Sequence, residues 1–290
     1  NQKALRKVMK EVVDRFAPCV ESALPARVIR ERALQPLAEA LGAVHFPAAD
    51  ADPRALEEGR DPAHRTLVFD EFFFLELGLA LKRRGVTLEP GIAFLVNHTY
   101  TKPLLKLLPF ALTEAQRRVL AEIKADMMAP HPMHRLVQGD VGCGKTAIAM
   151  GALYLAAKKG YQGALMAPTE VLARQHYETA KAVLEPLGAS CGLITGSMTA
   201  REHREAHEAI ASGYWQVAIG THALITEKVT YANLGLVVTD EQHRFGVRQR
   251  TALGAKGQSP NVLVMSATPI PRTLALILYG DLDISVVDEL

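Results

Sequence analysis

One segment constrains the fold of this chain more than any other: residues 139–146 read Gly-Asp-Val-Gly-Cys-Gly-Lys-Thr. This G-x-x-x-x-G-K-T pattern follows an apolar run typical of a strand and opens a helical pattern, which is the context that a phosphate-binding loop requires. Glycines let backbone N–H groups converge on phosphate oxygens, and the helix N-terminus adds partial positive charge. The predicted nucleotide-binding residues are Gly139, Gly142, Gly144, Lys145 and Thr146.

Two side chains of this loop have predicted chemical roles. Lys145 would neutralise the β- and γ-phosphates, and the Thr146 hydroxyl would bind Mg²⁺. Cys143 lies inside the loop, where a helix N-terminus can lower the pKa of a thiol and make it reactive. A small loop residue without reactivity is the favoured interpretation of Cys143.

From Phe110 onward, short apolar runs alternate with helical patterns. This alternation, with continuous apolar strands, predicts an α/β domain with a largely parallel sheet. The predicted strands are Arg135–Gln138, Gly163–Ala167, Cys191–Thr195, Gln216–Ile219, Leu236–Thr239, Asn261–Met265 and Ile284–Val287. The predicted helices are Lys145–Lys158, Val171–Leu184, Ala200–Ala211 (with a Thr199–Glu202 capping box) and Thr273–Leu278.

Residues 1–109 read as helical. Pro25 is expected to open a helix that Pro36 bends or splits, and residues 45–59 read as a loop. Asp61-Pro62 predicts a helix start, and the helix is expected to end at Gly85. Because this helix is apolar on more than one face, we expect it to be buried between other elements.

Composition limits the function classes. The chain has 290 residues, 49% of them apolar, and its 33 basic and 31 acidic residues give a net charge of +2. Disorder and a bulk basic coat are therefore excluded, so any nucleic-acid contact must come from individually placed residues. Three widely separated cysteines suit a reducing cytoplasm and make a zinc site unlikely. We see no secretory signal and no stretch long enough to span a membrane.

A second motif lies at the end of the predicted strand Leu236–Thr239, where the chain reads Asp240-Glu241-Gln242-His243. Parallel α/β sheets bind ligands at the carboxyl ends of their strands. Asp240 is expected to hold Mg²⁺ through water, and Glu241 to orient and deprotonate the attacking water. An exposed turn with two acids is the alternative.

The next predicted strand ends in Ser266-Ala267-Thr268-Pro269. The hydroxyls of Ser266 and Thr268 could bridge the acidic motif to a moving surface. Taken alone, a Ser/Thr turn before a helix is the better reading of this segment.

Together these motifs resemble the first lobe of a superfamily 2 helicase motor. They are most similar to the RecG family, bacterial ATP-dependent helicases that remodel branched DNA. The matching segments are residues 110–116, 139–146, 167–176, 195–197, 220–225, 240–250, 265–276 and 279–290. The resemblance is dense over 110–290 and looser over 1–109. The transcription–repair coupling translocase is a near alternative, but it and the primosomal fork helicase usually carry Asp-Glu-Glu where this chain has Asp-Glu-Gln.

The resemblance implies further roles. Gln116 would hydrogen-bond the adenine edge, with Phe110 as a possible stacking partner, and His243 would couple the nucleotide site to Ser266 and Thr268. The residues implied to contact the DNA backbone are Thr169, Arg174, Thr195, Gly196, Ser197, Thr221 and His222. Contacts of this kind position a strand without reading its sequence.

The resemblance also implies an architecture: a helical brace over residues 1–109, followed by a RecA-like ATP-binding lobe over residues 110–290. The second motor lobe and the wedge domain of this family have no counterpart in the chain, so little activity is expected from it alone. The implied cofactors are ATP and Mg²⁺, and the implied partner is branched DNA. The resemblance also implies a monomer that acts in the bacterial cytoplasm and does not bind membranes. A P-loop enzyme unrelated to DNA would lack the Ser-Ala-Thr motif, and a non-catalytic nucleotide-binding module stays open.

Overall fold

The structure is a computed structural model that describes residues 2–88, 90–94, 111–240, 256–257, 259–267 and 282–289. Its contacts divide the chain into two compact units, Asn1–Leu81 and Lys82–Leu290. Phe94 is 1% exposed and belongs to the core of the second unit, so that unit includes residues upstream of 110. The predicted boundary between residues 109 and 110 falls within residues 95–110, which lie outside the described part, and it stays a prediction.

The first unit is helical, as predicted. Its elements are α1 (Gln2–Phe16), η1 (Ala17–Cys19), α2 (Ala26–Glu31), α3 (Leu37–His45), α4 (Pro53–Glu57) and α5 (Pro62–Leu88), which runs on into the second unit. Pro36 immediately precedes α3 and separates it from α2, which confirms the predicted split. The predicted loop over residues 45–59 is partly wrong, because Asp52 caps the short helix α4 by accepting a hydrogen bond from the Arg54 backbone N–H.

Helix α5 departs from two predictions. Asp61 caps its start, accepting from the backbone N–H groups of Ala63 and His64 at 3.0 and 3.1 Å, but the helix continues through Gly85 to Leu88. A glycine inside a helix costs only about 1 kcal/mol, which a long helix tolerates. The predicted burial is also wrong for much of the described helix: Ala63 near its start is 2% exposed, but Val68 and Leu81 are 52% and 61% exposed.

Among the described residues, no helix combines the length and the apolarity that a membrane crossing needs.

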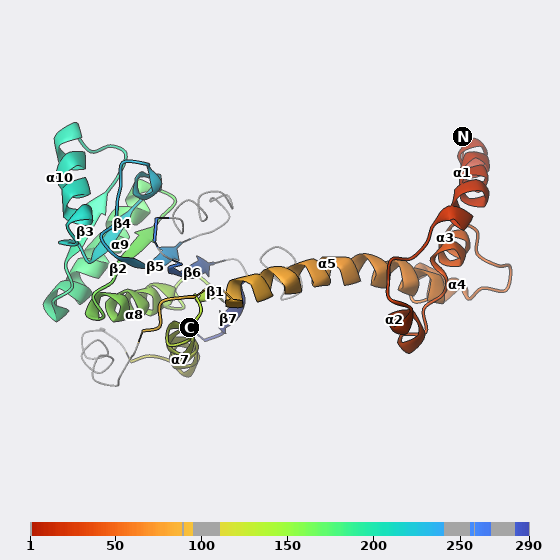
Figure 1. The fold of residues 1–290 in the computed structure, drawn as a ribbon, viewed down its shortest axis with the longest axis horizontal. Coiled ribbons are helices and arrows are strands. Elements are labelled where there is room, and N and C mark those ends of the chain that lie inside the picture. Colours follow the sequence, from red (N-terminus) through yellow and green to blue (C-terminus); the bar gives the residue numbers. More distant parts are fainter. Residues whose placement is uncertain are drawn as a thin grey trace. The chain divides into compact units, whose positions relative to one another are not determined.

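The second unit is built on a seven-stranded sheet in which every pair of neighbouring strands is parallel (Figure 1). The strand order is β3-β4-β2-β5-β6-β1-β7. The strands are β1 (His134–Gly139), β2 (Gln162–Met166), β3 (Cys191–Ile194), β4 (Val217–Gly220), β5 (Leu234–Thr239), β6 (Asn261–Ser266) and β7 (Asp283–Val287). Each agrees with its predicted range within two residues, so the predicted α/β class is confirmed.

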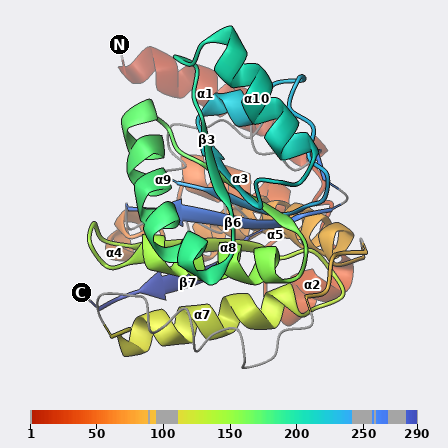
Figure 2. The same ribbon diagram turned by 90° about the vertical axis from the view of Figure 1, so that its left-hand side faces the viewer.

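Helices cover both faces of this sheet (Figure 2). On one face, α7, α8 and α9 pack on alternate strand residues such as Leu165 and Val238. On the other face, α10 and η3 pack on the intervening residues, such as Met166 and Val237. The helices are α7 (Glu114–Met127), α8 (Lys145–Lys158), α9 (Glu170–Leu184) and α10 (Ala200–Ala211), with the 3-10 helices η2 (Glu185–Leu187) and η3 (His222–Ile225). The Thr199–Glu202 capping box is present, and the predicted helix Thr273–Leu278 lies outside the described residues.

Candidate nucleotide site and strand-contact surface

The phosphate loop connects β1 to α8. Its backbone turns at Gly142 and Gly144, whose φ angles are +91° and +86°, a region that side-chain-bearing residues rarely adopt. Gly144 is also the N-cap of α8, so the first N–H groups of that helix open onto the loop. A Cβ atom on Gly139 would lie 2.5 Å from Cys143 Sγ. Positive φ angles at Gly142 and Gly144 and the close contact at Gly139 therefore favour glycine at all three positions of the loop.

Lys145 spans the loop. Its Nζ donates to the carbonyl oxygens of Gly139 and Asp140 at 2.6 and 2.7 Å. These are the contacts of a cation held close to its own loop, and phosphate oxygens would compete for the same amine. The backbone N–H groups of the glycine loop, the Lys145 amine and the Thr146 hydroxyl in the first turn of α8 form a set of groups that fits a nucleoside triphosphate with Mg²⁺. Cys143 is 1% exposed, which favours its interpretation as a small packing residue.

Gln116 lies against this loop from α7. Thr113 and Gln116 form a capping box at the start of the helix, and Gln116 Nε2 donates to the carbonyl oxygen of Cys143 at 2.9 Å. A Cβ on Gly144 would lie 2.4 Å from the same Nε2 atom. Gln116 thus ties α7 to the phosphate loop, while its contact with adenine stays a prediction, and Phe110 lies outside the described residues.

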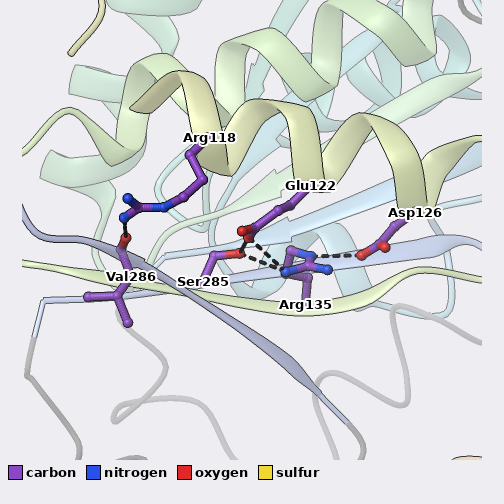
Figure 3. A network of polar contacts seen from close by, with 6 residues as sticks. All are labelled: Arg118, Glu122, Asp126, Arg135, Ser285 and Val286. Carbon is purple, nitrogen blue, oxygen red and sulfur yellow. Dashed lines mark hydrogen bonds and ion pairs between the residues drawn. The ribbon is translucent and has the colours of Figure 1, made fainter. Parts of the chain in front are cut away.

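Helix α7 is held on the sheet by a buried arginine of β1 (Figure 3). Arg135 is 8% exposed, and its guanidinium lies 3.1 Å from Glu122 Oε2 and 2.7 Å from Asp126 Oδ2, both on α7. Arg135 also donates to Ser285 Oγ on β7 at 2.7 Å. The network fixes the helix that carries Gln116 against the strand that leads into the phosphate loop.

The acidic motif begins where β5 ends. The Asp240 backbone N–H donates to Met166 O of β2 at 2.9 Å, and Asp240 Oδ2 lies 2.7 Å from Nε2 of His176 on α9. Ser266, the last residue of β6, is buried and in register with Gln138 of β1. Three predicted site residues, Glu241, His243 and Thr268, lie outside the described residues.

The predicted strand-contact residues follow the carboxyl ends of β2, β3 and β4. Thr169 caps α9, on which Arg174 is exposed; Thr195, Gly196 and Ser197 follow β3, and Thr221 and His222 follow β4. The structure therefore brings all seven residues to the same edge of the sheet. Within the described part of the chain, the buried Thr221 hydroxyl makes no hydrogen bond.

Glu170 joins two of these segments, and sequence reasoning missed it. As the first residue of α9, it accepts hydrogen bonds from the Ser197 hydroxyl and, at 3.0 Å, from the Ser197 backbone N–H. The hydroxyl contact, more than any other, lowers the pKa of the Glu170 carboxyl below its ordinary value. His176 was also missed as a site residue. Glu170 could have been noticed in the sequence, because it is a carboxylate next to Thr169, a predicted phosphate contact. The residues around His176 carry no comparable signal.

The fold and the loop define a P-loop nucleotide-binding domain with a parallel, RecA-like sheet. A family model described as DEAD/DEAH box helicase matches residues 113–277, which is more than half of the chain. The chain belongs to the DEAD/DEAH box helicase family.

The relatives narrow this class, and the resemblance to RecG is confirmed. The chain is 42% identical over 289 residues to ATP-dependent DNA helicase RecG of Bacillus subtilis, covering 99% of the chain and 41% of that protein. It is 44% identical over 294 residues to RecG of Escherichia coli K12, covering 100% of the chain and 42% of the relative. The chain thus spans about two-fifths of the length of these relatives.

Solved structures agree. "Structure of RecG bound to three-way DNA junction" matches with a TM-score of 0.84 and 38% identity, covering 99% of this chain and 38% of that one. The DNA-bound DUF1998 helicase MrfA matches with a TM-score of 0.52 and 16% identity, over 70% of this chain and 32% of that one, which supports the fold alone.

Proposed function

We propose that this chain is the ATP-binding lobe of a RecG-type motor that moves along DNA and remodels branched DNA. The observation that carries the proposal is the order of groups along the carboxyl edge of the sheet. Strand-contact candidates follow β3, β4 and β2, and the phosphate loop follows β1. Asp240 and Ser266 lie at the ends of β5 and β6, the two strands that separate β2 from β1. Nucleotide binding and hydrolysis at one end of this edge can therefore be coupled to DNA binding at the other end.

At the nucleotide end of this edge, the residues bind and orient phosphate. The backbone around Gly142 and Gly144 donates N–H groups, and Lys145 exchanges its loop carbonyls for phosphate oxygens. Mg²⁺, when bound, neutralises phosphate charge; Thr146 and Asp240 are the residues proposed to hold it. Glu241 is proposed to orient the attacking water and to accept its proton.

At the other end, Thr169, Arg174 and the segments after β3 and β4 are proposed to contact the DNA backbone. The Thr169 hydroxyl and the Arg174 guanidinium suit phosphate oxygens, and such contacts carry no sequence information. They also suit a chain with a net charge of only +2, because a few placed groups are sufficient. The relative solved with a three-way DNA junction supports branched DNA as the substrate.

We further propose that the second motor lobe and the wedge domain belong to the parts of RecG-like proteins that this chain does not span. In related NTPases an arginine supplied from outside the phosphate loop is worth about 10³–10⁵ in rate, and no residue here is assigned that role. We expect the protein to act as a monomer in the bacterial cytoplasm. Its described cysteines, Cys19, Cys143 and Cys191, are free thiols, which suits a reducing compartment.

The test is ATP hydrolysis by the longer protein that contains this chain, measured with a DNA fork, with linear duplex and without DNA. We expect the fork to raise the rate by at least an order of magnitude and linear duplex to raise it much less. A Glu241→Gln variant serves as the control that binds ATP without hydrolysing it. A rate insensitive to DNA would indicate a P-loop enzyme of another kind. Equal stimulation by linear duplex would favour a translocase of the transcription–repair coupling type.

Replacing Arg174 with alanine should remove one phosphate contact from the strand-contact surface. Each contact with single-stranded DNA contributes about 0.7 to the slope of log affinity against log salt, or about fivefold in affinity at 0.1 M salt. We therefore expect Arg174→Ala to lower the salt slope by about 0.7 and the affinity at 0.1 M salt about fivefold. Fluorescence anisotropy titrations with a labelled single-stranded oligonucleotide measure both quantities. Lys181→Ala, in the last turn of the same helix, is the matched control and should leave the slope unchanged. Equal losses in the two variants would contradict the assignment of Arg174.

A further inference from the structure

A buried histidine holds the carboxylate that the acidic motif offers to the metal. His176 is 6% exposed, and its Nε2 atom lies 2.7 Å from Asp240 Oδ2. The side chain of Asp240 is itself only 14% exposed. The carboxylate accepts, so Nε2 of the imidazole carries the donated proton. The two residues are 64 positions apart in the sequence and come from α9 and the end of β5.

We propose that His176 is a positioning residue for the Mg²⁺–nucleotide site. Its hydrogen bond commits Oδ2 of Asp240 to the protein, and the Asp240 backbone is fixed by its N–H bond to Met166 O. Asp240 is thereby restrained at its backbone N–H and at Oδ2, and its other carboxylate oxygen, Oδ1, stays available to the water molecules that surround the metal. Hydrogen-bond partners of metal-binding groups commonly contribute about 10–100-fold to metal affinity. The inference rests on the proposed function, because it presupposes that Asp240 serves Mg²⁺.

The same helix reaches the strand-contact surface. Glu170, at the first position of α9, holds Ser197 of the loop after β3, and the exposed Arg174 lies two residues before His176. A single rigid element therefore contacts both the predicted DNA-binding segments and Asp240. His176 is the residue through which a shift of α9 would reach the metal carboxylate.

The test compares His176→Gln with His176→Leu. A glutamine amide can place a nitrogen near the position of Nε2, whereas leucine fills similar space without a donor. Affinity for a fluorescent ATP analogue is measured in excess Mg²⁺ and in EDTA, so that the gain due to Mg²⁺ is obtained for each variant. We expect His176→Leu to lose about tenfold of this gain, with its affinity in EDTA unchanged. His176→Gln should retain most of the gain.

Three outcomes would overturn the inference: a full Mg²⁺ gain in His176→Leu, equal losses with Mg²⁺ and with EDTA, or a glutamine variant as impaired as the leucine variant. Thermal melting without nucleotide establishes that each variant is folded. Should the leucine variant not fold, His176→Asn takes its place, because its amide is too short to reach Asp240. If the unmodified protein shows no Mg²⁺-dependent binding, the proposed nucleotide site itself fails. If the unmodified protein shows the Mg²⁺ gain and His176→Leu shows it undiminished, only the role of His176 is refuted.

Discussion

Replacing Lys145 with alanine is expected to weaken ATP binding about 100-fold and to abolish hydrolysis by the longer protein. A charge-assisted contact to phosphate is worth about 1.5–3 kcal/mol, and 1.4 kcal/mol corresponds to a tenfold change in affinity. Stability should change little, because the Lys145 amine donates to two loop carbonyl oxygens, Gly139 O and Asp140 O, which water can reach once the side chain is gone. Isothermal titration with ATP and Mg²⁺ measures the loss.

Lys158→Ala is the matched control for this experiment. Lys158 ends the helix that Lys145 begins, so the variant removes the same charge from the opposite end of α8. Its affinity for ATP should stay within about twofold of the unmodified chain, since a charge at the far end of α8 is largely screened by salt. Equal affinities for Lys145→Ala and the unmodified chain would contradict the phosphate-loop assignment.

Replacing Arg135 with leucine is expected to lower the free energy of unfolding by about 3 kcal/mol. The substitution would leave Glu122 and Asp126 without their shared cation and remove the donor to Ser285 Oγ. The value lies at the low end for a broken buried ion pair, because the two carboxylate side chains are 38% and 22% exposed and regain some hydration. Urea denaturation followed by circular dichroism measures the change.

Arg118 on α7 provides the comparison. It pairs with Asp288 at 2.8 Å, but the two side chains are 50% and 61% exposed, so water and salt screen the pair. The Asp288 hydrogen bond raises the pKa of Arg118, and an arginine is charged at neutral pH with or without that shift. Arg118→Leu should therefore leave the denaturation midpoint nearly unchanged. Similar midpoints for the Arg118 and Arg135 variants would show that the buried network does not hold α7.

The sequence was sufficient for the elements that depend on local patterns. The glycines and Lys145 predicted both the loop and the start of α8, and the apolar run before Asp240 predicted β5. These signals are short and continuous, because a parallel strand buried on both faces reads as an unbroken apolar segment.

The contacts that join these elements could not be predicted in the same way. The hydrogen bond between His176 and Asp240, like the contact of Glu170 with Ser197, depends on strand order and on the direction of α9. Arg135 was part of a predicted strand, yet its acidic partners lie on a helix that pattern reasoning did not identify. The prediction that α5 is buried was wrong for a related reason. Its apolar faces predicted burial, but the periodicity of one helix does not show whether another element covers those faces.

The most direct test of the central claim is a crystal structure of this chain with Mg²⁺ and a non-hydrolysable ATP analogue. We predict that the phosphates lie in the loop formed by residues 139–146. Lys145 Nζ should leave the carbonyl oxygens of Gly139 and Asp140 for phosphate oxygens, while Asp240 keeps its contact with His176. An analogue bound elsewhere, with Lys145 still on its own loop, would contradict the account.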